Sequence, residues 1–363
     1  MTERIINFNP GPSAIPLPVL EKAQGELLNF QSSGMSIMET SHRAKEFDGL
    51  LAETQALALK LLGLGDNYKV MFMGGGASLQ FAMIALNLMN EGRTADYVNT
   101  GTWSTKAIKE AQIVGEPKVA ASSEETNFNR IPKQDELVLN PDASYVHITS
   151  NNTIKGTQWV DFPDTGDVPL IVDMSSDILS KRYTMDKVGM IYAGAQKNLG
   201  PSGVTVIVMR DDMIEKCKGD ALPTLLRYKT IWDKNSLYNT PPTFPIYLVK
   251  LVLDWIDGQG GLDAVEKINR AKGDLLYGLI DEMSDYYRGA TEKESRSLMN
   301  VCFRLPTEEL EKKLIADGRE AGFNGLKGHR SVGGIRVSMY NAISLDNIKA
   351  LVEYLKDFAG KNG

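Results

Sequence analysis

The chain has 363 residues, of which 42% are hydrophobic and 24% are charged, and this composition is typical of a folded globular protein. A chain of 363 residues is long enough for about two domains of roughly 100 to 200 residues each. With 40 basic and 46 acidic side chains the net charge is −6, which argues against the basic surface that nucleic acid binding requires.

The N-terminal residues do not resemble a signal peptide. The segment MTERIINFNPGPSAIP has an acid and a base among its first residues and prolines where a signal peptide needs an apolar run. No stretch approaches the ~18 apolar residues of a membrane span, so we expect a cytoplasmic protein with no membrane partner. Cys217 and Cys302 stand far apart, without a CxxC motif or a neighbouring histidine, so we expect two reduced structural thiols and no metal site.

Short apolar strands alternate with helices through most of the chain. In chain order the patterns predict a helix at 46–62, a strand at 68–73, helices at 79–89 and 104–111 around a strand at 95–98, and strands at 113–119, 145–149, 170–172, 190–193 and 204–209. This alternation favours a mostly parallel sheet covered by helices on both faces. We expect the last strand to run antiparallel, because the loop before it is too short for a helical crossover.

A glycine-rich segment at 258–261 follows a predicted helix at 246–256 and suggests a domain boundary. Beyond it the patterns predict helices at 262–283 and 308–321, strands at 301–305 and 334–339, and a closing helix after Ser344. We therefore expect three parts: an extended N-terminal segment at 1–15 that packs with the small domain, a large domain at 16–260, and a smaller α+β domain at 261–363.

The glycine turn GGGAS, Gly74 to Ser78, opens a predicted helix directly after a strand. Free backbone N–H groups at the positive end of a helix dipole bind phosphate well. The dinucleotide fingerprint fails because Leu79 stands in place of its third glycine, and a P-loop fails for want of a Gly-Lys-Ser/Thr step. The sequence therefore predicts a phosphate-binding turn, and the phosphate need not belong to a nucleotide. The alternative is a tight turn that binds no ligand.

Two charged residues follow neighbouring predicted strands. Asp173 comes directly after the apolar strand at 170–172, where open α/β sheets bind ligands, although a helix-capping role is the alternative. Lys197 is the single charge in YAGAQKNLGPSG at 192–203. An acid, an amine and a phosphate cradle meet the three needs of pyridoxal phosphate, which are a partner for the pyridine nitrogen, an amine for the Schiff base and a phosphate anchor.

Four dispersed motifs resemble the phosphoserine aminotransferase family of class V, fold-type-I pyridoxal phosphate enzymes. They are NPGPS at 9–13, SSGMSIMETSHR at 32–43, YAGAQKNLGPSG at 192–203 and YNTPPT at 238–243, and the resemblance covers essentially the whole chain. It implies an α/β fold with a large, mostly parallel mixed sheet flanked by helices and a smaller α+β domain. It also implies pyridoxal 5′-phosphate as the cofactor and a homodimer.

The resemblance also assigns roles at the cofactor. Lys197 becomes the Schiff-base lysine, Asp173 the partner of the pyridine nitrogen, and Trp103 the ring stacked on the cofactor. The other implied cofactor residues are Thr153 at the polar edge of the ring, Gly76, Ala77, Ser78 and Gln196 at the phosphate, and Asn239 and Thr240 supplied by the partner subunit. Some family members have an Arg-Gly pair where this chain has Ala77 and Ser78.

The three histidines bear on the substrate. Two of them precede arginines, as the pairs His42–Arg43 and His329–Arg330, and such pairs suggest a dianion held by guanidinium and imidazole donors. Arg336 in GGIRVSM is a separate guanidinium fork that suits a carboxylate. The resemblance assigns Arg336 to the α-carboxylate of the substrate and both His-Arg pairs to its phosphate end. His147 stands in the apolar strand YVHIT and is interpreted as a core or sheet-end histidine.

The implied reaction transfers an amino group between L-glutamate and 3-phosphohydroxypyruvate, giving O-phospho-L-serine and 2-oxoglutarate in serine biosynthesis. The family can also form 4-phosphohydroxy-L-threonine in pyridoxine biosynthesis. Two alternatives remain open. One is another fold-type-I enzyme, either an alanine–glyoxylate type aminotransferase or a cysteine desulfurase, which would need a reactive cysteine in a mobile loop. The other is a nonenzymatic phosphate-binding module, for which GGGAS alone would suffice.

Overall fold

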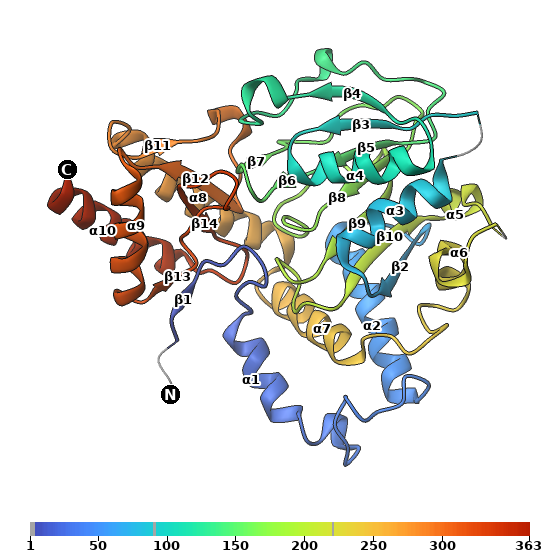
Figure 1. Ribbon diagram of the computed structural model, residues 1–363. Helices are drawn as coiled ribbons and strands as arrows, with labels where there is room; N and C mark the ends of the chain where they lie inside the picture. The colour runs from blue at the N-terminus through green and yellow to red at the C-terminus, as the bar shows by residue number, and fades with distance from the viewer. Residues whose placement is uncertain (1–3, 90–91, 220) are drawn as a thin grey trace.

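A mixed seven-stranded sheet forms the centre of the larger part of the molecule (Figure 1). The computed structural model describes residues 4–89, 92–219 and 221–363. The strand order is β2-β10-β9-β8-β5-β3-β4, and the strands are β2 (Tyr68–Met73), β3 (Asp96–Asn99), β4 (Lys118–Ser122), β5 (Val146–Thr149), β8 (Leu170–Asp173), β9 (Val188–Gly194) and β10 (Thr205–Arg210).

The directions of the strands confirm a mostly parallel sheet. Strands β9, β8, β5, β3 and β4 run parallel to one another, whereas β10 runs antiparallel to both β9 and β2. The antiparallel direction predicted for the last strand is therefore confirmed. Strands β8 and β9 are buried along their whole length, which explains why they read as nearly continuous apolar runs rather than as alternating ones.

Helices cover both faces of this sheet. Along β10, Val206 and Val208 face a core that includes α2 (Lys45–Leu62) and α7 (Thr243–Gly258), whereas Ile207 and Met209 face the opposite core. The second core includes α3 (Gly76–Leu88) and α4 (Thr102–Val114), which pack against each other, and buried side chains of two short helices, α5 (Asp211–Lys216) and α6 (Tyr228–Asp233). Helix α1 (Leu17–Glu26) also belongs to this part.

The prediction of a strand at 113–119 is wrong. Ile113 and Val114 instead complete α4, and β4 begins only at Lys118. Gly115 ends the helix with its N–H donated to the Ala111 carbonyl at 2.9 Å. The Ile113 side chain is 78% exposed, so its apolar character does not report burial in a sheet.

The helix predicted at 79–89 also starts earlier than expected. The Leu79 N–H reaches the carbonyl of Gly75 at 3.3 Å, so Gly75 precedes the helix and Gly76 is its first residue. The phosphate cradle predicted at GGGAS is therefore the start of α3 itself.

The C-terminal part is a second, smaller α+β unit (Figure 1). Its antiparallel sheet has the order β11-β12-β14. Its elements are α8 (Gly261–Glu282), β11 (Arg288–Gly289), β12 (Asn300–Arg304), α9 (Glu308–Glu320), β13 (Phe323–Asn324), β14 (Ile335–Ser338) and α10 (Leu345–Asn362).

Two short strands, β6 (Asn151–Asn152) and β7 (Thr157–Gln158), form a separate pair in the larger part. None of the helices within the described residues combines the length and the hydropathy of a membrane span.

The N-terminal segment lies against the smaller unit. Strand β1 (Ile6–Asn7) pairs in parallel with β13, and the Phe8 side chain is fully buried in the core beneath it. Figure 1 shows this blue segment running beside the orange and red elements. The boundaries of the domains at 15 and 260 stay a prediction.

Replacing Phe8 by alanine should lower the free energy of unfolding by about 3 to 5 kcal/mol, the usual cost of truncating a fully buried phenylalanine. Equilibrium unfolding in urea measures this change. Ile5→Ala is the matched control, because Ile5 is 49% exposed and its truncation should change the free energy by no more than about 0.5 kcal/mol. Equal, small changes for both variants would contradict the docking of this segment.

Candidate active site

The carboxyl edge of the sheet gathers the predicted chemical groups. Asp173 is the last residue of β8 and pairs with Tyr192 of β9, and Lys197 follows in the turn after that strand. The Asp173 carboxylate accepts hydrogen bonds at Oδ1 from the backbone N–H of Ser175 at 3.0 Å and from its hydroxyl at 2.6 Å. Burial raises the pKa of Asp173, and the charge of Lys197 opposes that rise.

Lys197 is held close to two other predicted site residues. Its Nζ donates to the Thr153 hydroxyl at 2.7 Å and lies 5.2 Å from the centre of the Trp103 ring. The pKa of Lys197 is lowered to about 8, mainly by desolvation; the Asp173 carboxylate opposes this fall, and the Arg336 cation adds to it. The structure therefore holds this lysine in an environment where a substantial fraction of the amine is neutral near pH 8.

Arg336 reaches the same place from the smaller unit. It lies on β14, is 6% exposed, and donates from Nη1 to the backbone carbonyl of Thr153 at 3.1 Å. Its Nε is buried and has no hydrogen-bond partner among the described residues. Burial lowers the pKa of this guanidinium, and no carboxylate forms an ion pair with it within the described chain. A guanidinium in this state is suited to receive the carboxylate of a ligand.

The glycine turn before α3 is open and uncapped. Gly75 has a φ of 91°, and no side chain caps the helix. A Cβ added to Gly76 would meet no heavy atom within 4 Å, so the backbone of the first turn borders free space. Ala77 and Ser78 continue that turn. The first N–H groups of α3 can therefore approach an anion closely, with the helix dipole favouring it.

Sheet register brings this turn close to Lys197. In β10, Thr205 pairs with Met73 on one side and with Gly194 on the other. The chain enters the glycine turn directly after Met73 and the lysine turn directly after Gly194. The two turns are thus separated by two strand spacings, or about 10 Å. Gln196 lies in the lysine turn, and its side chain folds back over Gly194, where a Cβ would approach its Oε1 to 2.8 Å.

These groups fit pyridoxal phosphate. The open N-terminus of α3 suits the phosphate, the buried Asp173 carboxylate suits the pyridine nitrogen, and the Lys197 amine suits the aldehyde. Trp103, near the start of α4, places its ring beside the Lys197 amine. Each group comes from a different element, but all of these elements end or begin at the same edge of the sheet.

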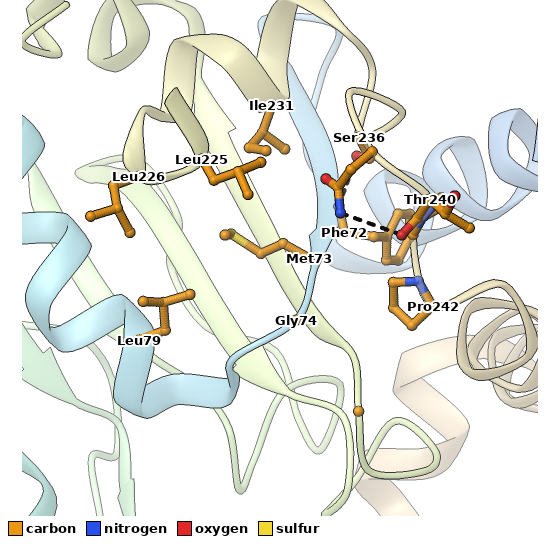
Figure 2. Close-up of a pocket in the computed structure, with 13 residues that line it drawn as sticks. Phe72, Met73, Gly74, Leu79, Leu225, Leu226, Ile231, Ser236, Thr240 and Pro242 are labelled. Atoms are coloured by element: carbon orange, nitrogen blue, oxygen red, sulfur yellow. Dashed lines mark hydrogen bonds between the residues drawn. The ribbon is translucent and has the colours of Figure 1, made fainter. Parts of the chain in front are cut away.

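Asn239 and Thr240 lie on the surface beside the glycine turn. They line a cavity of about 450 Å³ together with Gly74, Leu79 and several apolar side chains. Figure 2 shows Thr240 on one side of this cavity and Leu79 on the other, with Gly74 at its rim. Both polar residues are exposed, and the Asn239 amide reaches only the Thr240 carbonyl, at 3.4 Å. Their role at a cofactor phosphate stays a prediction.

The two His-Arg pairs lie in different places. The chain segment with His42 and Arg43 precedes α2, whose beginning lies toward the lower edge of Figure 1, away from β14. Arg43 is exposed, and the buried Nε2 of His42 has no partner among the described residues. His329, by contrast, is close enough to Arg336 for that charge to lower its pKa, after the larger effect of burial. The structure therefore brings only the second pair near Arg336 of the same chain.

His147 lies in the core, as interpreted from the sequence. It is 1% exposed, its Nε2 bonds the Tyr192 hydroxyl at 2.9 Å, and its ring stacks on Tyr97 with centroids 4.9 Å apart. It supports the strand that pairs with Asp173 rather than facing the open side of the site.

One buried acid at this edge is missed by the sequence analysis. Asp177 accepts hydrogen bonds from the hydroxyls of Tyr183, at 2.6 Å, and Ser150, and from the Gln158 amide at 3.1 Å. The Ser150 hydroxyl is also within 2.9 Å of the Asp173 backbone carbonyl. Burial raises the pKa of Asp177 to about 6. This hydrogen-bond network fixes the loop that follows Asp173. The sequence DMSSD at 173–177 does not distinguish such a buried loop from a turn on the surface.

The chain is similar to proteins of one enzyme family. The family model described as Aminotransferase class-V matches residues 5–351. The phosphoserine aminotransferase of Desulfatibacillum aliphaticivorans is 59% identical over 365 residues, covering 100% of both chains. The solved phosphoserine aminotransferase of Bacillus circulans subsp. alkalophilus is 52% identical with a TM-score of 0.98, again covering 100% of both chains. A PLP-bound phosphoserine aminotransferase from Trichomonas vaginalis is 38% identical with a TM-score of 0.91, covering 97% of this chain and 100% of that one.

The stability of the fold should depend on pH through His147. Burial lowers the pKa of His147 to about 3 from the ordinary 6.5, so between these values the unfolded histidine binds a proton that the folded one does not. The free energy of unfolding therefore falls as the pH drops from 6.5 toward 3, by about 1.4 kcal/mol per pH unit for this group.

Glutamine at position 147 keeps polar atoms for Tyr192 but cannot take up the proton. The cost of His147→Gln, measured by urea unfolding, should thus be about 2 kcal/mol smaller at pH 5 than at pH 7. A cost that is the same at both pH values would mean that the buried imidazole is protonated as easily in the fold as in the unfolded chain.

Proposed function

The chain belongs to the phosphoserine aminotransferase family within the class V aminotransferases, and on this premise we propose that it transfers an amino group between L-glutamate and 3-phosphohydroxypyruvate. The products are O-phospho-L-serine and 2-oxoglutarate, and the reaction belongs to serine biosynthesis. The observation that carries the proposal is the grouping of the Lys197 amine, the buried Asp173 carboxylate and the uncompensated Arg336 cation at one edge of the sheet.

Pyridoxal 5′-phosphate, when bound, supplies the electron sink that lets the substrate lose the proton at its α-carbon. Asp173 keeps a positive charge on the pyridine nitrogen, because a buried carboxylate is most stable beside a cation. Lys197 would hold the cofactor through its amine, and the same amine, when free, would move the proton at the α-carbon of the substrate. Its pKa of about 8 lets it both accept and return that proton near neutral pH.

Arg336 binds the α-carboxylate of either substrate. Its guanidinium is already oriented by the Thr153 carbonyl at 3.1 Å, and its unpartnered Nε can complete a two-point contact with a carboxylate. Because the Thr153 hydroxyl also accepts from Lys197, one residue links the position of the carboxylate to that of the proton-transferring amine. This linkage supports the orientation of the α-carbon toward Lys197.

The distal end of each substrate is an anion, a phosphate in one case and a carboxylate in the other. A cluster of cations that accepts the first can accept the second, so one site serves both half-reactions. His329 of the same chain is close enough to Arg336 for that charge to lower its pKa, after burial, and we assign His329 and the adjacent Arg330 to this end. His42 and Arg43 complete it from a second copy of the chain.

A symmetric homodimer is part of the proposal. Exposed large apolar side chains occur in the segments that carry the residues assigned to a partner: Leu28, Met35 and Met38 precede His42 and Arg43, and Leu225 and Tyr238 precede Asn239 and Thr240. Such exposed apolar groups favour burial against another subunit. In a twofold dimer each copy gives and receives the same residues, so Asn239 and Thr240 would complete the phosphate cradle of the partner.

A cysteine desulfurase is disfavoured by the two thiols. Such an enzyme needs a reactive thiolate, and burial raises the pKa of Cys217 and of Cys302 to about 12. Cys302 moreover lies within β12, where a mobile loop is impossible.

Lys197→Ala should abolish amino transfer and the borohydride-fixable attachment of pyridoxal phosphate to the chain. The exposed Lys187, whose Nζ donates to the Gly166 carbonyl at 2.6 Å, gives the matched control Lys187→Ala, which should keep both. The measurements are a coupled assay with glutamate and 3-phosphohydroxypyruvate, and mass spectrometry after reduction. Fixation of the cofactor in Lys197→Ala at the wild-type level would overturn this assignment.

Mixing two inactive variants tests the shared site. Arg43→Ala damages the distal anion site of the partner, and Lys197→Ala damages the site of its own chain. A hybrid dimer carries one intact site, so random reassociation of equal amounts should restore about a quarter of the wild-type activity. No recovery, in a mixture shown by mass spectrometry to contain hybrids, would place Arg43 in the site of its own chain.

A further inference from the structure

Lys106, on α4, is not used by the reaction as described above. We propose that Lys106 is a specificity-determining residue that binds the distal anion of the substrate from the same chain as Lys197. This inference rests on the proposed function and adds a residue to its phosphate end. The chemistry recognised is a phosphate or carboxylate group carried on a short 2-oxo or 2-amino acid.

The first observation is the shared contact with Trp103. Lys106 lies one helical turn after Trp103, and its Nζ is 4.8 Å from the centre of the indole ring. The Lys197 Nζ lies 5.2 Å from the centre of the same ring. The two amines are therefore no more than about 10 Å apart, and Lys106 stands at the border of the site rather than on a remote part of the helix.

The second observation is the position of His329. Its pKa is lowered first by burial and then by the charges of Arg336, Arg330 and Lys106. His329 therefore lies within the electric field of cations from two units: Lys106 comes from the larger part of the molecule, whereas the two arginines come from the smaller one. The cation cluster assigned to the distal anion thus extends across the join to α4.

The third observation is that these cations form no ion pair within the described residues, although Glu308 and Glu311 line the same cavity as His329 and Arg330. Within the part of the chain that the structure describes, Lys106, His329, Arg330 and Arg336 form no ion pair with an aspartate or glutamate, although many exposed lysines and arginines elsewhere do. Like charges held together raise the energy of the free site, and an anion that enters relieves this repulsion. The buried Nε of Arg336, which has no partner among the described residues, is suited to the α-carboxylate of the same ligand.

Lys106 should act more strongly on the phosphorylated substrate than on glutamate. An ammonium is a compact point charge, so its attraction grows with the charge of the group it meets, and a phosphate carries more negative charge than a carboxylate. Arg336, in contrast, meets a carboxylate in both substrates. Lys106 would therefore set the preference between the two distal anions, whereas Arg336 serves both substrates alike.

Steady-state kinetics of the holoenzyme test this role. Lys106→Met should raise the KM for 3-phosphohydroxypyruvate about tenfold or more, with a smaller rise for glutamate and with kcat within about threefold of wild type. Lys106→Arg keeps the charge and should recover most of the loss. Lys109→Met is the matched control, because Lys109 is an exposed lysine three residues further along the same helix; it should leave both KM values unchanged.

Calorimetric titration of the same holoenzymes with inorganic phosphate gives a readout that does not depend on turnover. Lys106→Met should weaken phosphate binding by a factor similar to its effect on KM, and Lys109→Met should not. Unchanged phosphate binding and an unchanged KM in Lys106→Met would overturn the inference, as would an equal loss in Lys106→Arg. A wild-type enzyme that binds phosphate but does not turn over 3-phosphohydroxypyruvate would instead refute the proposed function, and the titration would still decide the role of Lys106.

Discussion

The electrostatic balance at the Lys197 amine is the constraint on which the rest of the site depends. Removing this amine from water lowers its pKa, whereas the neighbouring Asp173 carboxylate raises it, and the pKa of about 8 is the outcome of both effects. The balance requires that an acid and an amine be buried side by side without neutralising each other completely. The parallel strands β8 and β9 bring the two groups together, because both strands end at the same edge of the sheet. Asp173 is the last residue of β8, and Lys197 lies in the turn after β9.

The antiparallel strand β10 adds the phosphate end of the site to this edge. It separates β9 from β2, so the glycine turn after β2 and the lysine turn after β9 open on the same side about 10 Å apart. A strand in the parallel direction at this place would need a crossover connection, whereas the short turn from Lys197 to Thr205 suffices here. The single reversal of direction thus sets the distance between the amine and the anion cradle.

The sequence predicted those features that follow from local patterns. Apolar runs predicted the strands, Asp173 was found because it directly follows one of them, and Lys197 was found because it is the single charge in the segment at 192–203. A strand at 113–119 was predicted wrongly, because the apolar Ile113 lies exposed on the helix. Lys106 could not be distinguished from Lys109, since only the contact with the Trp103 ring separates two lysines on one helix. Contacts of this kind depend on side-chain direction in the folded state, which no sequence spacing records.

The join between the two units is part of the catalytic geometry rather than a passive boundary. The buried Lys272 of α8 donates to the backbone carbonyls of Met339, Tyr340 and Ile343, at 2.8 to 3.0 Å, and so fixes the turn after β14. From this turn, Asn341 donates its backbone N–H to the side chain of Asn198, the residue next to Lys197, at 2.9 Å. The strand that carries Arg336 is therefore connected to the loop that carries Lys197. These hydrogen bonds couple the position of Arg336 to that of Lys197 across the join between the two units.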